Sequence, residues 1–198
     1  MGRPRTNDEV VKERLLSTAT ELLATEPPDS ITVRALASAA GATTAAVYTL
    51  FGSKDALMEQ VRQTAVIGLF DDLSAVPTTD DPLADLYALA VAYRHWAREH
   101  RHLYMALFGG VQTFDPSGAV GAVDPVRPLV ETIERALSLS VLVGDPASIA
   151  VSIWITLHGL VTLELAGALE SATADSALTT TVPALLRGWT GPFPQPSA

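Results

Sequence analysis

Apolar residues recur along most of the chain at spacings of three and four positions, and almost no segment alternates with period two for long. This spacing is typical of amphipathic helices, so the sequence predicts an all-α fold. The segment 109–125, with four glycines and two prolines, is expected to form a loop, and 191–198 a loose tail. The helices expected on this basis span residues 8–25, 32–40, 43–51, 54–74, 83–99, 101–108, 126–143, 146–169 and 175–188.

Two short predicted helices near the N-terminus are joined by Ala40-Gly41-Ala42, the pattern of a helix-turn-helix. In such a motif the second helix enters the major groove of DNA. The alternative is that Tyr48 and Phe51 are core residues of a small helical domain that binds no DNA. The positions expected to face inward are Val33, Leu36, Ala37, Ala40, Val47, Leu50 and Phe51, and those expected to face outward are Thr43, Thr44, Ala45, Tyr48 and Thr49.

The stretch 32–57 resembles the DNA-binding signature of the TetR family of transcriptional regulators, with Gly41, Tyr48-x-x-Phe51 and Ser53-Lys-Asp-x-Leu57 in register. The resemblance implies a homodimer with an N-terminal three-helix DNA-binding domain, residues 1–58, and a helical ligand-binding and dimerisation domain, residues 59–198. Leu50 departs from the family pattern, because that position is often polar or aromatic there. The DNA-contacting residues that the resemblance implies are Arg34, Thr43, Thr44, Ala45, Ala46, Tyr48, Thr49 and Lys54, with Arg3 and Arg5 as an arm onto phosphates or the minor groove.

The charge of the chain is uneven along its length. The whole chain carries a net charge of −9, from 13 basic and 22 acidic residues. Residues 1–62 hold seven basic and eight acidic groups, so the remainder carries −8. The N-terminal third can therefore face DNA while the rest stays acidic. The chain has no cysteine and begins without an apolar leader segment, so we expect a cytoplasmic protein.

In the second half, the segment from Trp96 to Phe108 and the motif Trp154-x-x-x-His158-Gly159 resemble the Trp-His-Gly subgroup of TetR regulators. Aromatic side chains at helical spacing can line an apolar ligand cavity, although they are more often core. The residues expected to contact a ligand are Trp96, Tyr104, Met105, Phe108, Trp154 and His158. The residues expected in a dimer interface are Ile149, Ser152, Ile153, Leu160, Leu163, Leu178, Val182, Leu185 and Leu186.

Other functions are less well supported by the sequence. His95 and Glu99 lie four positions apart but lack a clear third ligand, so we predict no metal site and no cofactor. The chain has no Gly-x-Ser-x-Gly elbow and no phosphate-binding loop, so we predict no enzyme. The uncharged segment 146–163 is near the lower length limit for a membrane helix, and a buried helix explains it better. The carboxylates of Asp80, Asp81 and Asp85 are expected on a solvated surface.

These observations predict a ligand-responsive homodimeric repressor that leaves a near-palindromic operator when a small, apolar effector binds. The effector would favour a conformation in which the helix 54–74 is tilted, which changes the spacing of the two recognition helices. An all-α enzyme and a helical scaffold that binds no DNA remain the alternatives.

Overall fold

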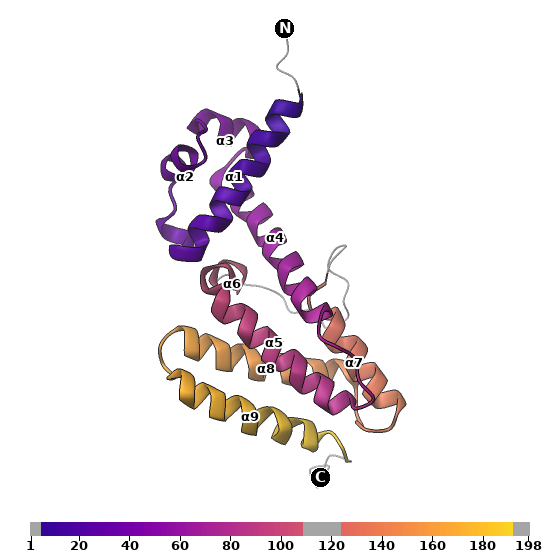
Figure 1. Ribbon diagram of the computed structural model, residues 1–198. Helices are drawn as coiled ribbons and strands as arrows, with labels where there is room; N and C mark the ends of the chain where they lie inside the picture. Colours follow the sequence, from indigo (N-terminus) through magenta and orange to yellow (C-terminus); the bar gives the residue numbers. More distant parts are fainter. Residues whose placement is uncertain (1–4, 109–123, 192–198) are drawn as a thin grey trace, which may run out of the picture. The chain divides into compact units, whose positions relative to one another are not determined.

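The computed structural model of the chain describes residues 5–108 and 124–191. In these ranges every regular element is a helix, which confirms the all-α prediction (Figure 1). The first part of the chain contains α1 (Arg5–Thr25), the short 3-10 helix η1 (Pro28–Ser30), α2 (Val33–Ala39), α3 (Thr44–Phe51) and α4 (Lys54–Ser74). The second part contains α5 (Pro82–Glu99), α6 (Arg101–Phe108), α7 (Arg127–Ser138), α8 (Pro146–Leu165) and α9 (Ser171–Gly188).

The helices form two compact units. The N-terminal unit contains residues 5–66 and 100–108, and the C-terminal unit contains residues 67–99 and 124–191. This division differs from the boundary that we expect after residue 58, because α4 is continuous through that point and α6 packs against α1. The helix that follows α5 in sequence, α6, therefore belongs to the N-terminal unit.

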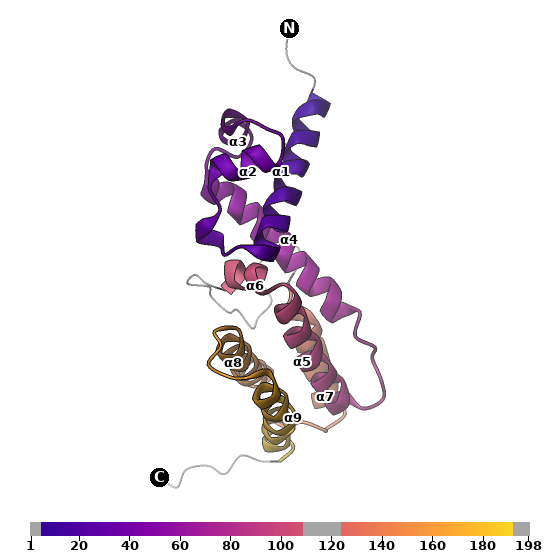
Figure 2. The same ribbon diagram turned by 60° about the vertical axis from the view of Figure 1, so that its left-hand side comes forward.

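The N-terminal unit is built around α1, which contacts α2, α3 and α6 (Figure 2). The side chains of Leu15, Ala19 and Leu23 repeat every four residues along α1 and are fully buried. Leu36 of α2 and Val47 of α3 complete this core at 1% exposure or less. Burying such side chains stabilises a small helical domain by about 1.5–3 kcal/mol each.

The turns of the helix-turn-helix follow from local side-chain chemistry. The Thr32 hydroxyl caps α2 by accepting a hydrogen bond from the Ala35 amide at 3.1 Å. Gly41 has a φ of +59°, a left-handed conformation that reverses the chain between α2 and α3. Ser53 caps α4, since its hydroxyl accepts a hydrogen bond from the Ala56 amide at 3.0 Å.

The C-terminal unit packs α8 against α5, α7 and α9, and both views show α8 and α9 side by side (Figures 1 and 2). By length and composition, α8 is the one helix of the described chain that could span a membrane. This is weak evidence, because a core helix of a soluble protein passes the same test. The contacts of α8 with three helices of its own unit support the core interpretation.

Three helix ends differ from the sequence prediction by four residues or more, and α1 begins three residues earlier than predicted, at Arg5. The helix α7 ends at Ser138 instead of residue 143, since Ser140 has a φ of +57° and the Val143 amide donates to the Trp189 carbonyl at 2.7 Å. The helix α8 ends at Leu165 instead of residue 169, and Gly167 follows with a φ of +75°. The helix α9 begins at Ser171, four residues earlier than predicted. The predicted tail and most of the predicted loop, residues 192–198 and 109–123, lie outside the described residues.

Candidate nucleic-acid interface and effector cavity

The face of α3 that turns away from the core carries small polar side chains and one aromatic ring. Tyr48 is 54% exposed, whereas Val47 is fully buried and Phe51 is 8% exposed. The structure therefore separates the two aromatic residues of the motif: Phe51 belongs to the core and Tyr48 does not. We define the recognition face as the exposed residues Thr43, Thr44, Ala45, Tyr48 and Thr49. Ala46, which the resemblance assigns to DNA, and Leu50, which is expected to face inward, are both half-buried.

The start of α3 is capped by a side-chain hydroxyl. The Thr43 hydroxyl accepts a hydrogen bond from the Ala46 amide at 3.1 Å and so serves as the N-cap of the helix. Its hydroxyl proton is still available for donation to a phosphate oxygen. At the other end, Gly52 has a φ of +82° and terminates the helix before α4 begins. The recognition helix is thus eight residues long.

The basic residues that the resemblance assigns to DNA differ in their surroundings. Arg34 on α2 is exposed and has no ion-pair partner in the described part of the chain. Lys54 is half-buried, and its Nζ donates to the Pro28 carbonyl at 3.4 Å. Lys12, which the sequence reasoning did not single out, lies 5.7 Å from the centroid of the Phe51 ring. This contact joins α1 to α3, so only the folded unit reveals it. Of the proposed arm, Arg3 lies outside the described residues, and Arg5 is the first residue of α1.

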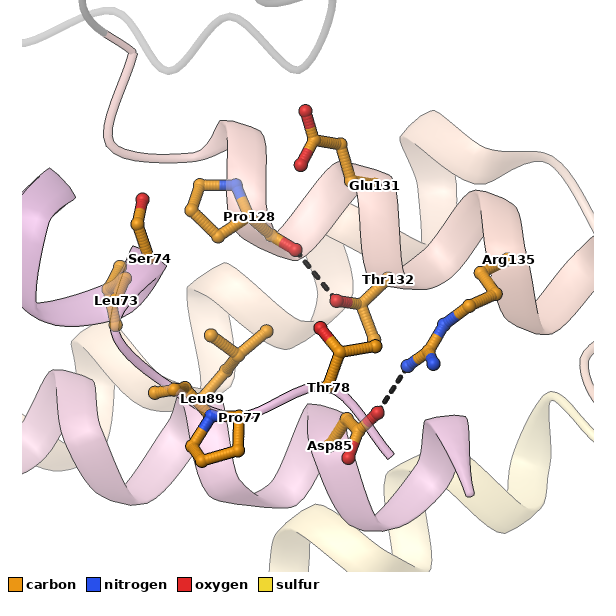
Figure 3. A pocket seen from close by; sticks show the side chains of 11 residues that line it. Leu73, Ser74, Pro77, Thr78, Asp85, Leu89, Pro128, Glu131, Thr132 and Arg135 are labelled. Carbon is orange, nitrogen blue, oxygen red and sulfur yellow. Dashed lines mark hydrogen bonds and ion pairs between the residues drawn. The ribbon is translucent and has the colours of Figure 1, made fainter. Parts of the chain in front are cut away.

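A cavity of about 220 Å³ lies in the C-terminal unit, between the last turn of α4, the segment that follows it, α5 and α7 (Figure 3). Figure 3 shows apolar side chains on one side and the Thr132 and Arg135 side chains of α7 on the other. None of the residues predicted to contact a ligand lines it. The lining residues are Leu73, Ser74, Val76, Pro77, Thr78, Asp85, Leu89, Pro128, Glu131, Thr132 and Arg135.

Asp85 lies on the polar side of this cavity and is only 4% exposed. Its carboxylate forms an ion pair with Arg135 and accepts hydrogen bonds from the Thr79 amide at 2.9 Å and hydroxyl at 2.7 Å. Burial alone raises the pKa of this carboxyl, but these hydrogen bonds outweigh it and lower the pKa below its ordinary value. The expectation that Asp85 is a solvated surface residue is therefore wrong, whereas Asp80 and Asp81 are exposed.

The residues predicted to contact a ligand are divided between the two units. In the C-terminal unit the rings of Trp154 and His158 stack with centroids 4.9 Å apart, and the Tyr93 hydroxyl lies 3.4 Å from His158 Nδ1. Burial lowers the pKa of His158 and so favours the neutral ring. Trp96, also in this unit, is 2% exposed. Tyr104, Met105 and Phe108 lie on α6 in the N-terminal unit, where the Tyr104 and Phe108 rings are 4.8 Å apart and Met105 is 42% exposed.

The predicted dimer interface needs a correction. Five of its residues lie in the core of the single chain at 4% exposure or less, which leaves them no surface for a partner: Ile149, Ile153, Leu178, Val182 and Leu186. A helix that is apolar nearly all round does not reveal from sequence which side is internal. Ser152 is half-buried and accepts a hydrogen bond from Trp189 Nε1 at 3.2 Å. Leu163 is 49% exposed, and Leu160 and Leu185 are half-buried, so these positions stay predictions.

His95 and Glu99, near the end of α5, form an ion pair on the surface. His95 Nε2 lies 3.3 Å from Glu99 Oε1, and both side chains are more than half exposed. Within residues 5–108 and 124–191, no three side chains of the metal-binding types come together.

Comparison with known proteins identifies the class of protein to which this chain belongs. Residues 15–61 match the sequence model described as "Bacterial regulatory proteins, tetR family", and residues 86–185 match "Tetracyclin repressor-like, C-terminal domain". An uncharacterized HTH-type transcriptional regulator of Mycobacterium tuberculosis is 28% identical over 94% of this chain and 89% of its own length. The chain is thus a helix-turn-helix transcriptional regulator, a DNA-binding protein without enzymatic activity.

It belongs to the TetR family. Solved structures show the same fold. A protein of unknown function from Rhodococcus sp. RHA1 has a TM-score of 0.75 at 24% identity, with 91% of this chain and 96% of that chain covered. A TetR variant of Acinetobacter baumannii in complex with minocycline has a TM-score of 0.64 at 19% identity, with 88% and 93% covered. Regulators of this family bind DNA and small-molecule effectors, form dimers, and are soluble cytoplasmic proteins.

Proposed function

We propose that the protein is a homodimeric repressor that binds a near-palindromic operator and is released by a small effector. The observation that carries this proposal is the recognition face of α3, which is exposed, begins at a capped helix end and includes a Tyr48 side chain that the core does not use. A helix of this kind docks in the major groove through close contacts with phosphates and base edges.

Dimerisation follows from the geometry of DNA. One recognition helix covers one half-site, so a second copy must reach the next major groove, about one helical turn away. On α8 the exposed Ile155 and Leu163 side chains, 58% and 49% exposed, supply apolar surface that a second copy can cover. Ile155 and Leu163, together with the predicted Leu160 and Leu185, form the proposed dimer interface in place of the five buried residues.

For the effector, the cavity between α4, α5 and α7 is the first candidate site. It includes Leu73 and Ser74 at the end of α4, the helix that begins directly after the recognition helix. Its volume of about 220 Å³ is below the range of about 300–1,000 Å³ that is usual for ligand sites, which favours a small compound. Leu73 and Leu89 favour an apolar body, and Arg135 and Glu131 favour one polar group. The stacked Trp154–His158 pair is the second candidate, and the Trp-His-Gly resemblance stays a prediction.

The proposal is tested by selecting fragments of genomic DNA with the purified protein and with Tyr48→Ala, at low and at moderate salt. We expect a palindromic site that only the unsubstituted protein enriches, with affinity that falls steeply as salt increases because phosphate contacts release counterions. If no fragment is enriched at low salt, with and without a library of small effectors, the helix-turn-helix is a scaffold and the proposal is wrong.

A further inference from the structure

The recognition face lacks the side chains that usually distinguish one base from another. Residues 43–51 contain no Arg, Lys, Asn, Gln, Asp or Glu. Apart from the Tyr48 ring, the exposed groups are the Ala45 Cβ and the hydroxyl and γ-methyl groups of Thr43, Thr44 and Thr49. The oxygen of the Thr43 hydroxyl accepts the capping hydrogen bond, and its proton is available for a phosphate contact.

Each base presents a different pattern of groups in the major groove, and each pattern is recognised by a different type of side chain. Guanine is read by Arg or Lys, adenine by Asn or Gln, and cytosine by Asp or Glu, while the 5-methyl group of thymine is read by apolar contact with Ala or Thr methyls. Threonine hydroxyls bind several bases with little preference. The composition of the recognition face therefore matches the thymine methyl group and no other base-specific feature.

The two basic residues that follow α3 in the sequence have partners within the chain. Lys54 donates to the Pro28 carbonyl, and Arg62 is paired with Glu59 at 2.6 Å. Arg34, on α2, is exposed and long enough to bind a phosphate or a base independently of α3. Substitution of Arg34 therefore tests a contribution to DNA binding that lies outside α3.

We propose that α3 identifies the operator through thymine 5-methyl groups, with Ala45 and the γ-methyls of Thr44 and Thr49 as the contact surface. This inference rests on the proposed function, in which α3 enters the major groove. It adds the chemistry of the target: each half-site carries thymines, on either strand, at the positions that α3 covers.

The test replaces the thymines of the selected operator one at a time by deoxyuridine, which lacks only the 5-methyl group, and measures binding by fluorescence anisotropy. Removing one buried methyl group is expected to lower affinity about 4-fold, at one or more positions in each half-site. Replacing such a T·A pair by 5-methylcytosine·G is expected to cost less than replacing it by C·G, because the methyl group is kept.

Two variants assign the effect to α3. Thr49→Ser keeps the hydroxyl and deletes the γ-methyl, so it is expected to weaken binding a few-fold and to remove the thymine-to-uracil difference at one position only. The control Arg34→Ala is expected to weaken binding while every thymine-to-uracil ratio stays unchanged.

The outcomes separate this inference from the proposed function. If an operator is recovered but full uracil substitution of its half-sites changes affinity less than about 2-fold, the methyl readout is wrong and the regulator remains. The same holds if the positions covered by α3 contain no thymine on either strand. If no operator is recovered, both are wrong.

Discussion

The stability of the C-terminal unit is expected to depend on one buried arginine. Arg94 of α5 forms two hydrogen bonds with Glu164 of α8, from Nε to Oε2 at 2.7 Å and from Nη2 to Oε1 at 2.8 Å. Its Nη1 donates to Asp175 of α9 at 2.5 Å. The side chains of Arg94 and Glu164 are 8% and 5% exposed, whereas Asp175 is 62% exposed. Arg94 therefore joins α5 to α8 through a buried ion pair and to α9 through a more exposed one.

Arg94→Met leaves the Glu164 carboxylate buried without its main partner. Breaking a buried ion pair in this way costs about 3–5 kcal/mol. We expect about 3 kcal/mol, because Arg98 Nε lies 3.5 Å from the same carboxylate and compensates in part. The double substitution Arg94→Met with Glu164→Leu should be close to the unsubstituted protein, because no charge is then left unpaired.

The pH dependence provides a second readout. Hydrogen bonds from Arg94 lower the pKa of Glu164 despite its burial, so the pair stabilises the fold above the unfolded-state pKa of about 4.3 and less as the pH falls below it. In Arg94→Met, burial without Arg94 is expected to raise that pKa instead, so the deficit should begin to shrink above about 4.3, as the pH falls through the raised pKa, and should shrink further below about 4.3, where the unsubstituted protein loses its own stabilisation.

Urea unfolding followed by tryptophan fluorescence measures this effect, because Trp96, Trp154 and Trp189 all lie in the C-terminal unit. Protein concentration must be held constant, since the proposed dimerisation would contribute to stability. The matched control Arg187→Met removes an exposed arginine of α9 and should change stability by no more than about 0.5 kcal/mol. A loss below about 1 kcal/mol for Arg94→Met, or one that does not vary with pH, would refute this reasoning.

Two further predictions address the turn of the motif and the cavity. Gly41→Ala should lower the free energy of unfolding by about 1–2 kcal/mol, because φ at this position is +59°, a conformation that residues with a side chain rarely adopt. No steric clash adds to this cost, since nothing lies within 4 Å of the added Cβ. Urea unfolding followed by circular dichroism measures the change, and an unchanged stability would contradict the prediction. Thr132→Phe fills the cavity, so the effector should no longer release this variant from DNA, while its affinity for the operator stays unchanged. Ser138→Phe, at an exposed position of the same helix, should be released normally. Fluorescence anisotropy measures both, and release of both variants would exclude this cavity as the effector site.

The helix-turn-helix was predictable because its signals are local. Thr32, Thr43 and Ser53 each cap a helix through an amide three positions ahead, and Gly41 marks the turn. Such contacts depend only on neighbours in the sequence, so the bounds of α2 and α3 agree with the prediction within one residue.

Contacts between distant parts of the chain could not be predicted in this way. Asp85 and Arg135 are 50 positions apart, and Arg94 and Glu164 are 70 positions apart. Nothing in either local sequence distinguishes these charges from solvated ones. Similarly, α8 is apolar on nearly every side, so the choice of Ile149 and Ile153 as interface residues had no basis in periodicity, and packing within the chain placed them in the core.

The central claim is that the recognition face of α3 is the surface that binds DNA, and the affinity of Ala45→Glu for the selected operator tests it most directly. Ala45 is exposed in the first turn of α3, where a carboxylate favours the helix through its dipole, so the fold should be kept. Gln63→Glu adds the same charge at an exposed position of α4. We predict that Ala45→Glu loses about 100-fold or more in affinity through repulsion from the DNA, with Gln63→Glu within about 2-fold of the unsubstituted protein. Equal affinity of the two variants for the operator would contradict the account.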